Sequence, residues 1–271
     1  PDSTGGLQPS EVTIAEVLKL RGYATLAVGK WHLGHLPHYL PTNQGFDRYF
    51  GIPYSNDMDR DTTIPAADVF RRTMEPKITD YNVPLMRDAK IVERPADQTT
   101  ITQRYTDEAI AFIRQQQKQP FFLYLAHSLP HVPLFRPKEF EGRSARGIYG
   151  DVIEEIDHNV GRILDTLREL KLDQQTLVVF LSDNGPWMPY VEQGGSAGLL
   201  RGAKGSTWEG GMRVPAIFWQ PGSVQPGVTV GIGSEMDLLP TIARLAGASV
   251  PPGRSLDGQD LSATLTMRAP S

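Results

Sequence analysis

The stretch Gly22–His35, GYATLAVGKWHLGH, is the most informative part of the sequence. Gly22 can end a preceding helix, and the apolar run Ala24–Val28 is typical of a short buried strand. A lysine and a histidine follow at positions 30 and 32. Residues two apart in an extended segment point to the same side, so we expect Lys30 and His32 to face one anionic ligand. The alternative is a surface lysine that happens to lie near a histidine.

Apolar periodicity predicts further helices and strands around this stretch. The expected helices span residues 9–21, 97–117, 150–171 and 237–246, and the expected strands span 24–29, 120–126, 175–182 and 214–219. Residues 175–182, QTLVVFLS, are continuous, apolar and β-branched, as is typical of a central parallel strand. The order of elements indicates an α/β fold with a mainly parallel sheet. We expect residues 1–271 to form one domain, in which the irregular segment of about 35–95 is a wall of the active site.

The composition excludes several classes of protein. The 271 residues carry 27 basic and 31 acidic side chains, and the net charge of −4 provides no basic surface for nucleic acid or an acidic membrane. No apolar run is long enough for a membrane span. There are no cysteines, so these residues contain neither disulfides nor thiolates. Both ends read as loops and the first residue is not Met, so we interpret the chain as part of a longer protein.

Polar residues follow three of the expected strands. The first strand ends in the Lys-Trp-His sequence, the second is followed by His127 and His131, and the third by Asp183 and Asn184. Ligands of open α/β sheets bind beyond the carboxyl ends of the strands. The sequence therefore predicts a site where these three strands end.

The residue types suggest separate tasks. Asp183 and Asn184 offer hard oxygen donors that suit Ca²⁺ or Mg²⁺, although they are also typical of a turn, and two donors do not complete a calcium shell. His131 lies between two prolines that would hold it in place for proton transfer, whereas we expect His127 to pack in its loop. Lys204, in the glycine-rich GAKGSTWEGG, can bind an oxyanion or be a mobile surface lysine.

Long motifs throughout the chain resemble those of the sulfatases, particularly the arylsulfatase branch of the family. They are GYATLAVGKWHLGH, QGFDRYFGIPYSND, PFFLYLAHSLPHVP, YGDVIEEIDHNVGRIL, TLVVFLSDNGP, GLLRGAKGSTWEGGMRVPA and SEMDLLPTIARLAG. The resemblance implies an alkaline-phosphatase-like α/β fold, with helices on both faces of the sheet, that lacks its first strand and C-terminal subdomain. It also implies a sulfuric ester hydrolase acting on a small-molecule or glycan sulfate in an extracytoplasmic compartment.

The resemblance implies a role for each site residue. Lys30 and Lys204 would bind the sulfate, and Ser55 would form a hydrogen bond near the nucleophile. His32 would take a proton from the covalent intermediate, and His131 would protonate the leaving oxygen. Two ligands of a divalent cation, usually calcium, would be Asp183 and Asn184.

The family's nucleophile is missing from the sequence. It is formylglycine, made from a Cys or Ser in Cys-x-Pro-x-Arg, and neither Ser-x-Pro sequence of the chain has arginine at the required position. We therefore expect this chain alone to be inactive. A lost central strand is also expected to leave two sheet edges unpaired.

Two alternatives remain open. One is a phosphomonoester or phosphodiester hydrolase of the same superfamily, with two zinc ions. The other is a non-catalytic protein that binds sulfated glycans. The sequence determines neither the oligomeric state nor the natural substrate.

Overall fold

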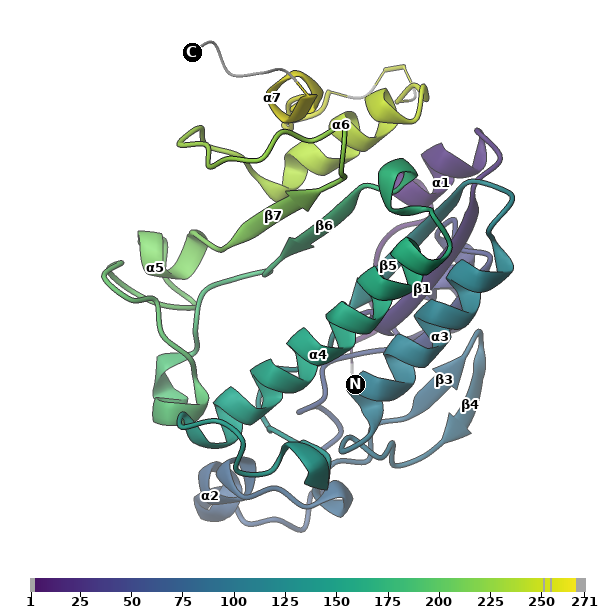
Figure 1. Cartoon of the computed structure of the whole chain (residues 1–271). Helices are drawn as coiled ribbons and strands as arrows, with labels where there is room; N and C mark the ends of the chain where they lie inside the picture. The colour runs from purple at the N-terminus through teal and green to yellow at the C-terminus, as the bar shows by residue number, and fades with distance from the viewer. Residues whose placement is uncertain (1–2, 251, 254, 267–271) are drawn as a thin grey trace.

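The computed structural model describes residues 3–250, 252–253 and 255–266. Its main sheet has five strands in the order β4-β3-β2-β1-β5, and β6 and β7 form a separate two-stranded sheet (Figure 1). The strands are β1 (Ala24–Lys30), β2 (Arg48–Ile52), β3 (Leu85–Arg87), β4 (Lys90–Glu93), β5 (Phe121–Ala126), β6 (Val178–Leu181) and β7 (Ala216–Trp219). The helices are α1 (Ile14–Lys19), α2 (Val69–Met74), α3 (Ile101–Gln115), α4 (Gly147–Glu169), α5 (Glu209–Met212), α6 (Leu238–Leu245) and α7 (Ser262–Thr266).

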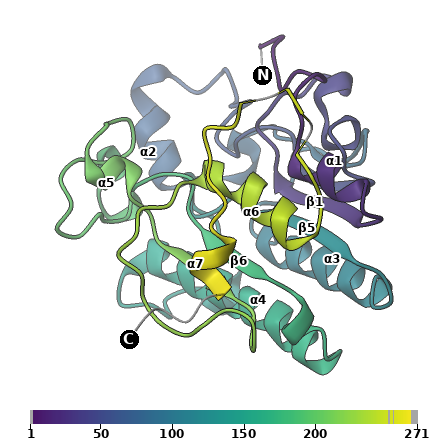
Figure 2. The same cartoon turned by 90° about the horizontal axis from the view of Figure 1, so that it is seen from above.

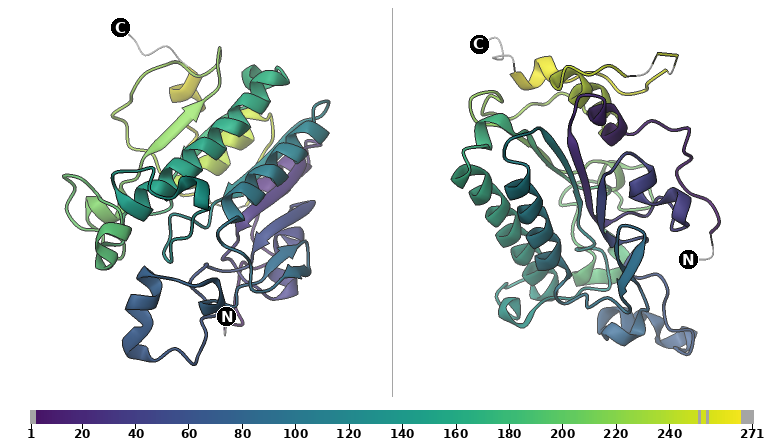
Figure 3. Two further views of the ribbon diagram at one scale, coloured as in Figure 1. Left: turned by 60° about the horizontal axis from the view of Figure 1, so that its bottom comes forward. Right: turned by 90° about the vertical axis from the view of Figure 1, so that its right-hand side faces the viewer.

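The centre of the main sheet is parallel. Strand β1 pairs in parallel with both β2 and β5, whereas β3 and β4 are added antiparallel at one side. Helix α3 packs on one face of these parallel strands with α4 lying along it, and α1 contacts the other face (Figure 3). Helix α6 lies beside α1, as the view from above shows (Figure 2). The prediction of a mainly parallel α/β sheet with helices on both faces is thus confirmed.

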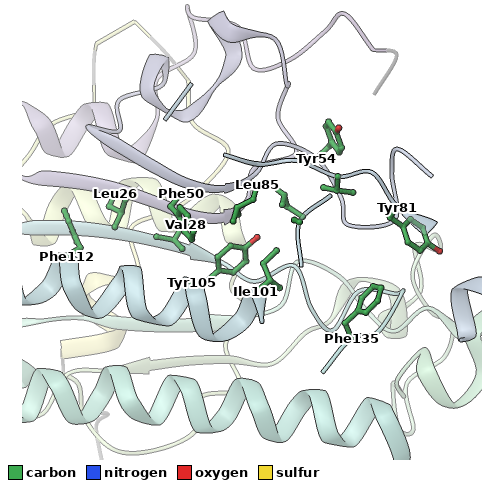
Figure 4. Packing of buried hydrophobic residues seen from close by; sticks show 13 residues of the cluster. Leu26, Val28, Phe50, Tyr54, Tyr81, Leu85, Ile101, Tyr105, Phe112 and Phe135 are labelled. Atoms are coloured by element: carbon green, nitrogen blue, oxygen red, sulfur yellow. The ribbon is translucent and has the colours of Figure 1, made fainter. Parts of the chain in front are cut away.

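Side-chain alternation along β1 gives the sheet two cores. Leu26 and Val28 join a cluster beneath α3 that includes Tyr105 and Phe112 (Figure 4), while Ala27 between them points into a second cluster with Trp31. A strand buried on both faces reads as a continuous apolar run, because neither set of alternating side chains meets water. This is why the run in β1 predicted the strand well.

The boundaries of several elements differ from the predictions. Helix α1 begins at Ile14, not near residue 9, because Thr13 is its N-cap and forms a capping box with Glu16. Strand β2 was not predicted as a separate element. It lies in the irregular segment of about 35–95, where its five residues are too few for a clear period.

The prediction that residues 175–182 form a central parallel strand is wrong. The strand is shorter, Val178–Leu181, and it pairs antiparallel with β7 alone. Its Phe180 side chain is 41% exposed. An apolar β-branched run reports a strand but not its partner, since strand pairing depends on residues distant in sequence.

Strands β5 and β6 each have a neighbour on one side only within the described part of the chain. Tyr124 of β5 is 43% exposed. Strands β4 and β7 likewise have one neighbour there, so the expectation that a missing central strand leaves two edges unpaired stays a prediction. Among the same residues, no helix combines the length and apolar character needed to cross a membrane.

Candidate active site

The carboxyl ends of β5, β1 and β2 lie side by side. Gly29 pairs with Ala126 of β5, and Lys30 pairs with Ile52 of β2, so the three strands end at one level. The loops that follow carry the histidines at positions 32 and 131 and the Ser55 side chain. The parallel register therefore brings together residues that are about a hundred positions apart.

Backbone contacts beyond the strand, rather than strand alternation, determine the position of His32. Strand β1 ends at Lys30, and His32 has a positive φ of 56°. The N–H groups of Trp31 and His32 donate to the carbonyls of Ile52 and Pro53, at 3.0 and 3.1 Å. The chain thus follows the β2 loop into the site, and the expected alternation from Lys30 to His32 does not apply.

Burial and neighbouring charges act together on Lys30. Burial is the largest influence and lowers its pKa, the charge of Asp183 raises it, and Lys204 lowers it. The charges of Asp183 and Lys204, which come from distant segments, therefore act on the Lys30 ammonium group. Two lysines whose charges repel each other favour a bound anion, which relieves that repulsion.

The two site histidines are both held toward the neutral form. The pKa of His32 is lowered first by burial and then by the charge of Lys30. The pKa of His131 is also lowered by burial, although the carboxylate of Asp57 raises it. The Nδ1 atom of His131 lies 2.6 Å from the carbonyl oxygen of Val132, which can only accept, so Nδ1 carries the hydrogen.

Lys204 is held against an aromatic ring. Its Nζ lies 4.7 Å from the centroid of Trp187, whose ring is 5.4 Å from that of His131. The backbone N–H of Lys204 also donates to the carbonyl of Pro186 at 2.9 Å. The glycine-rich loop thus directs this lysine toward His131, and it is not a freely mobile surface side chain.

Asp183 and Asn184 offer a partial set of cation ligands. The Asp183 carboxylate makes no hydrogen bond or ion pair with the described residues. The Nδ2 atom of Asn184 donates to the carbonyl of Gly185 at 2.9 Å, which leaves the side-chain oxygen of Asn184 available as a ligand. Adjacent carboxylate and amide oxygens fit a hard cation. The described residues contain no cluster of three or more His, Cys, Asp or Glu that could hold a metal ion. These two residues therefore fit part of a coordination shell.

Ser55 and His127 are buried polar residues at the strand ends. Ser55 is 3% exposed and its hydroxyl has no hydrogen-bond partner within the described residues, as suits a group that contacts a ligand. Both ring nitrogens of His127 are also buried without a partner there, and burial lowers its pKa to about 4. His127 is therefore neutral at physiological pH, and no charge from the lysine and histidine group acts on it.

Sequence reasoning missed two neighbours of Ser55. The charge of Asp57 raises the pKa of Lys30, His32 and His131, so this carboxylate acts on all three side chains. Asn56 is fully buried and donates to the loop that carries His131. Their only sequence signal was their place beside Ser55 in the GIPYSND motif.

Comparison with known proteins places this geometry in a family. A family model described as Sulfatase matches residues 2–248. The chain belongs to the sulfatase family. It is 43% identical to human arylsulfatase A over 272 residues, which cover 98% of this chain and 53% of that protein. It is 41% identical to N-acetylgalactosamine-6-sulfatase of Sus scrofa over 270 residues, which cover 95% and 49%.

A solved sulfatase has the same arrangement of elements. The crystal structure of PsFucS1 sulfatase from Pseudoalteromonas sp. matches with a TM-score of 0.84 at 28% identity, covering 98% of this chain and 57% of that one. The family and fold expected from the motifs are thus confirmed. The sulfatase chain described here spans about half the length of the curated relatives it matches.

Proposed function

We propose that the protein containing this chain hydrolyses sulfate monoesters. The observation that carries the proposal is the convergence of two lysines and two histidines at the ends of β1 and β5 and in the glycine-rich loop. The names of the relatives include an arylsulfatase and an amino-sugar sulfatase. The proposed substrate is accordingly an aryl or glycan sulfate, met in an extracytoplasmic compartment.

The two lysines bind the sulfate group. A sulfate monoester carries one negative charge, and more charge develops on its oxygens as the S–O bond breaks. The charge of Lys204 acts on Lys30, which supports a role for both lysines in stabilising this charge. Ser55 adds a hydroxyl group that has no hydrogen-bond partner within the described residues.

His131 donates a proton to the leaving oxygen. Its Nδ1 hydrogen is held by the Val132 carbonyl, so Nε2 is the nitrogen that exchanges a proton. Burial lowers its pKa in the free protein, and the negative charge of a bound sulfate raises it. Binding of the substrate anion therefore favours the protonated ring that the reaction needs.

His32 accepts a proton in the step that releases sulfate. Its pKa is lowered by burial and by Lys30, so the ring is neutral and able to accept. Proximity to Lys30 places it at the same sulfate group.

Asp183 and Asn184 contribute to holding a divalent cation, calcium or magnesium. Such an ion supplies positive charge beside the sulfate oxygens. The charge of Asp183 acts on Lys30, so a cation held there would lie beside the sulfate site. The other ligands, and a formylglycine nucleophile, would come from outside these 271 residues, since the chain has no cysteine.

The test compares sulfate and phosphate esters in the full-length protein. We expect hydrolysis of p-nitrophenyl sulfate in preference to p-nitrophenyl phosphate. Replacing Lys204 by Ala removes a stabilising charge and lowers kcat/KM about a hundredfold. Lys118→Ala is the matched control, because Lys118 is exposed and precedes the amino end of β5, whereas the site lies beyond the carboxyl end of that strand. A preference for the phosphate ester would instead support a phosphoester hydrolase.

Binding measured together with turnover separates an enzyme from a protein that merely binds sulfated ligands. Calorimetry with inorganic sulfate on the 271-residue chain should show weaker binding for Lys204→Ala than for Lys118→Ala. Equal binding by the two variants would show that Lys204 does not contact the anion. Normal sulfate binding with no turnover by the full-length protein would support the non-catalytic alternative.

A further inference from the structure

The loop that carries His131 has few backbone N–H donors of its own. Pro130 and Pro133 flank the histidine, and proline has no N–H group to donate. The carbonyls of His131 and Pro133 therefore need donors from elsewhere in the protein. Both donors come from one side chain on a different loop, that of Asn56.

Asn56 is fully buried and joins three segments of the chain. Its Nδ2 lies 3.3 Å from the carbonyl oxygen of His131 and 3.1 Å from that of Pro133. The same Nδ2 is 3.2 Å from Oε1 of Gln98, which precedes α3, so its two hydrogens are shared among three acceptors. Gln98 Nε2 in turn donates to the Asn56 carbonyl at 3.2 Å. The amide is thus fixed before it reaches the histidine loop.

The two carbonyls that Asn56 binds lie on either side of the carbonyl that orients the imidazole. The His131 Nδ1–H donates to the Val132 oxygen at 2.6 Å, and Val132 lies between His131 and Pro133. Holding the flanking carbonyls fixes the direction of the central one. A fixed Val132 carbonyl keeps the hydrogen on Nδ1 and leaves Nε2 for proton transfer.

We propose that Asn56 is a positioning residue for His131, acting through the backbone of residues 131–133 to set the tautomer and direction of the imidazole. The catalytic meaning of this role rests on the proposed function, whereas its structural meaning does not. Gln98 in turn holds the backbone carbonyl of Asn56, which lies between Ser55 and Asp57. The Asn56–Gln98 pair therefore links the segment of the site hydroxyl and carboxylate to the histidine loop.

The first test is made on the 271-residue chain by ¹⁵N NMR of its histidine rings, with His131→Gln to assign the signal. In the parent sequence we expect the neutral His131 ring to carry its hydrogen on Nδ1. Asn56→Leu and the isosteric Asn56→Asp remove the two donated hydrogen bonds, so the two tautomers should mix and the two ring nitrogen shifts should converge. The titration of His131 should move as well, because the ring changes its position relative to Asp57, Lys204 and Lys30.

The control is Asn159→Leu, which removes another buried asparagine, on α4, whose Nδ2 donates to the Glu155 carbonyl at 2.9 Å. It should leave the His131 signals unchanged. An unchanged tautomer in both Asn56 variants would overturn the proposal. Loss of folding in both, under conditions where Asn159→Leu remains folded, would also overturn it, since Asn56 would then serve the fold and not the ring.

The second test uses the full-length protein and the leaving group of the substrate. A poor leaving group needs a proton more than a good one. For Asn56→Asp we expect kcat on a sugar sulfate to fall at least about tenfold more than kcat on p-nitrophenyl sulfate, with little change in KM. Equal losses on both substrates would contradict positioning of the acid. If no sulfate ester is hydrolysed at all, the proposed function fails while the NMR result still decides the role of Asn56.

Discussion

Glycines near the ends of β1 and β2 let neighbouring backbones approach closely beneath the candidate site. Gly29 has a φ of 103°, and a Cβ at this position would run into the carbonyl of Ala126 on β5. The next strand repeats the arrangement, because a Cβ on Gly51 would meet the carbonyl of Gly29. Three backbones can therefore approach closely directly before the candidate site residues.

Gly29→Ala should strongly destabilise the protein. The substitution combines an unfavourable positive φ with a collision against backbone, and we expect a loss of about 3 kcal/mol in the free energy of unfolding. Gly22→Ala is the control, since its φ is 79° but no atom lies within 4 Å of an added Cβ. That variant should lose about 1 kcal/mol. Urea unfolding measures both, and equal losses would show that the collision is relieved at little cost.

The contact between α3 and α4 contains a buried acid. Glu155 on α4 is 1% exposed, and neither carboxylate oxygen has a hydrogen-bond partner that meets normal geometry within the described residues. Burial, followed by the charge of Glu139, raises its pKa to about 7, while the neighbouring Thr102 on α3 lowers it. The two helices therefore pack around a neutral, protonated Glu155 at acidic pH. Above neutral pH they pack around its buried carboxylate, which destabilises the folded state.

The stability of the protein should therefore depend on pH through Glu155. Its folded pKa lies above the unfolded value of 4.5, so its favourable contribution is complete below that value and is lost as pH rises through 7. Glu155→Gln removes this dependence. Relative to the parent, the variant should gain up to about 3 kcal/mol between pH 4.5 and pH 8.

Urea unfolding at several pH values measures this difference. Glu154→Gln, at a neighbouring position whose side chain is 43% exposed, should leave the pH dependence unchanged. The same slope in the parent and in Glu155→Gln would show that Glu155 does not titrate on unfolding.

At the scale of the whole molecule, the two sheets differ in support. Strand β1 has a partner on both sides, with Leu26, Ala27 and Val28 all at most 2% exposed. Within the described residues, β6 and β7 pair with each other and with no further strand, and Ile217 of β7 is 58% exposed. An isolated two-stranded sheet is marginally stable, so Asp183 and Asn184 follow the less stable of the two sheets.

Hydrogen exchange should reveal this difference. Amides of β6 should exchange at least about tenfold faster than those of β1, because local opening of the small sheet does not require disruption of the main core. Mass spectrometry of peptides covering Val178–Leu181 and Ala24–Lys30 provides the measurement within one sample. Peptides from α4 should exchange as slowly as those of β1. Equal protection of β6 and β1 would mean that the two sheets open as one unit.

The site was partly predictable from the sequence because chemistry depends on residue type. The two lysines, His32 and His131 were recognisable from polar groups placed directly after apolar strands or among glycines. Asn56 and Asp57 were not, because an asparagine and an aspartate before a turn have no distinctive local pattern. Their contacts reach residues about 75 positions away, which no local periodicity reports.

The sequence by itself determined the longer helices, the apolar strands β1 and β5 beneath the candidate site and the family to which the chain belongs. The elements follow from side-chain type and from periods of two and 3.6 residues, and the family follows from the resemblance of long motifs, all of which are local properties of the chain. The tertiary structure alone decided that β6 pairs with β7, that His32 leaves the strand with a positive φ, and that Asn56 holds the His131 loop. Each of these depends on contacts between segments far apart in the chain, whose energies are fixed only when the backbones meet.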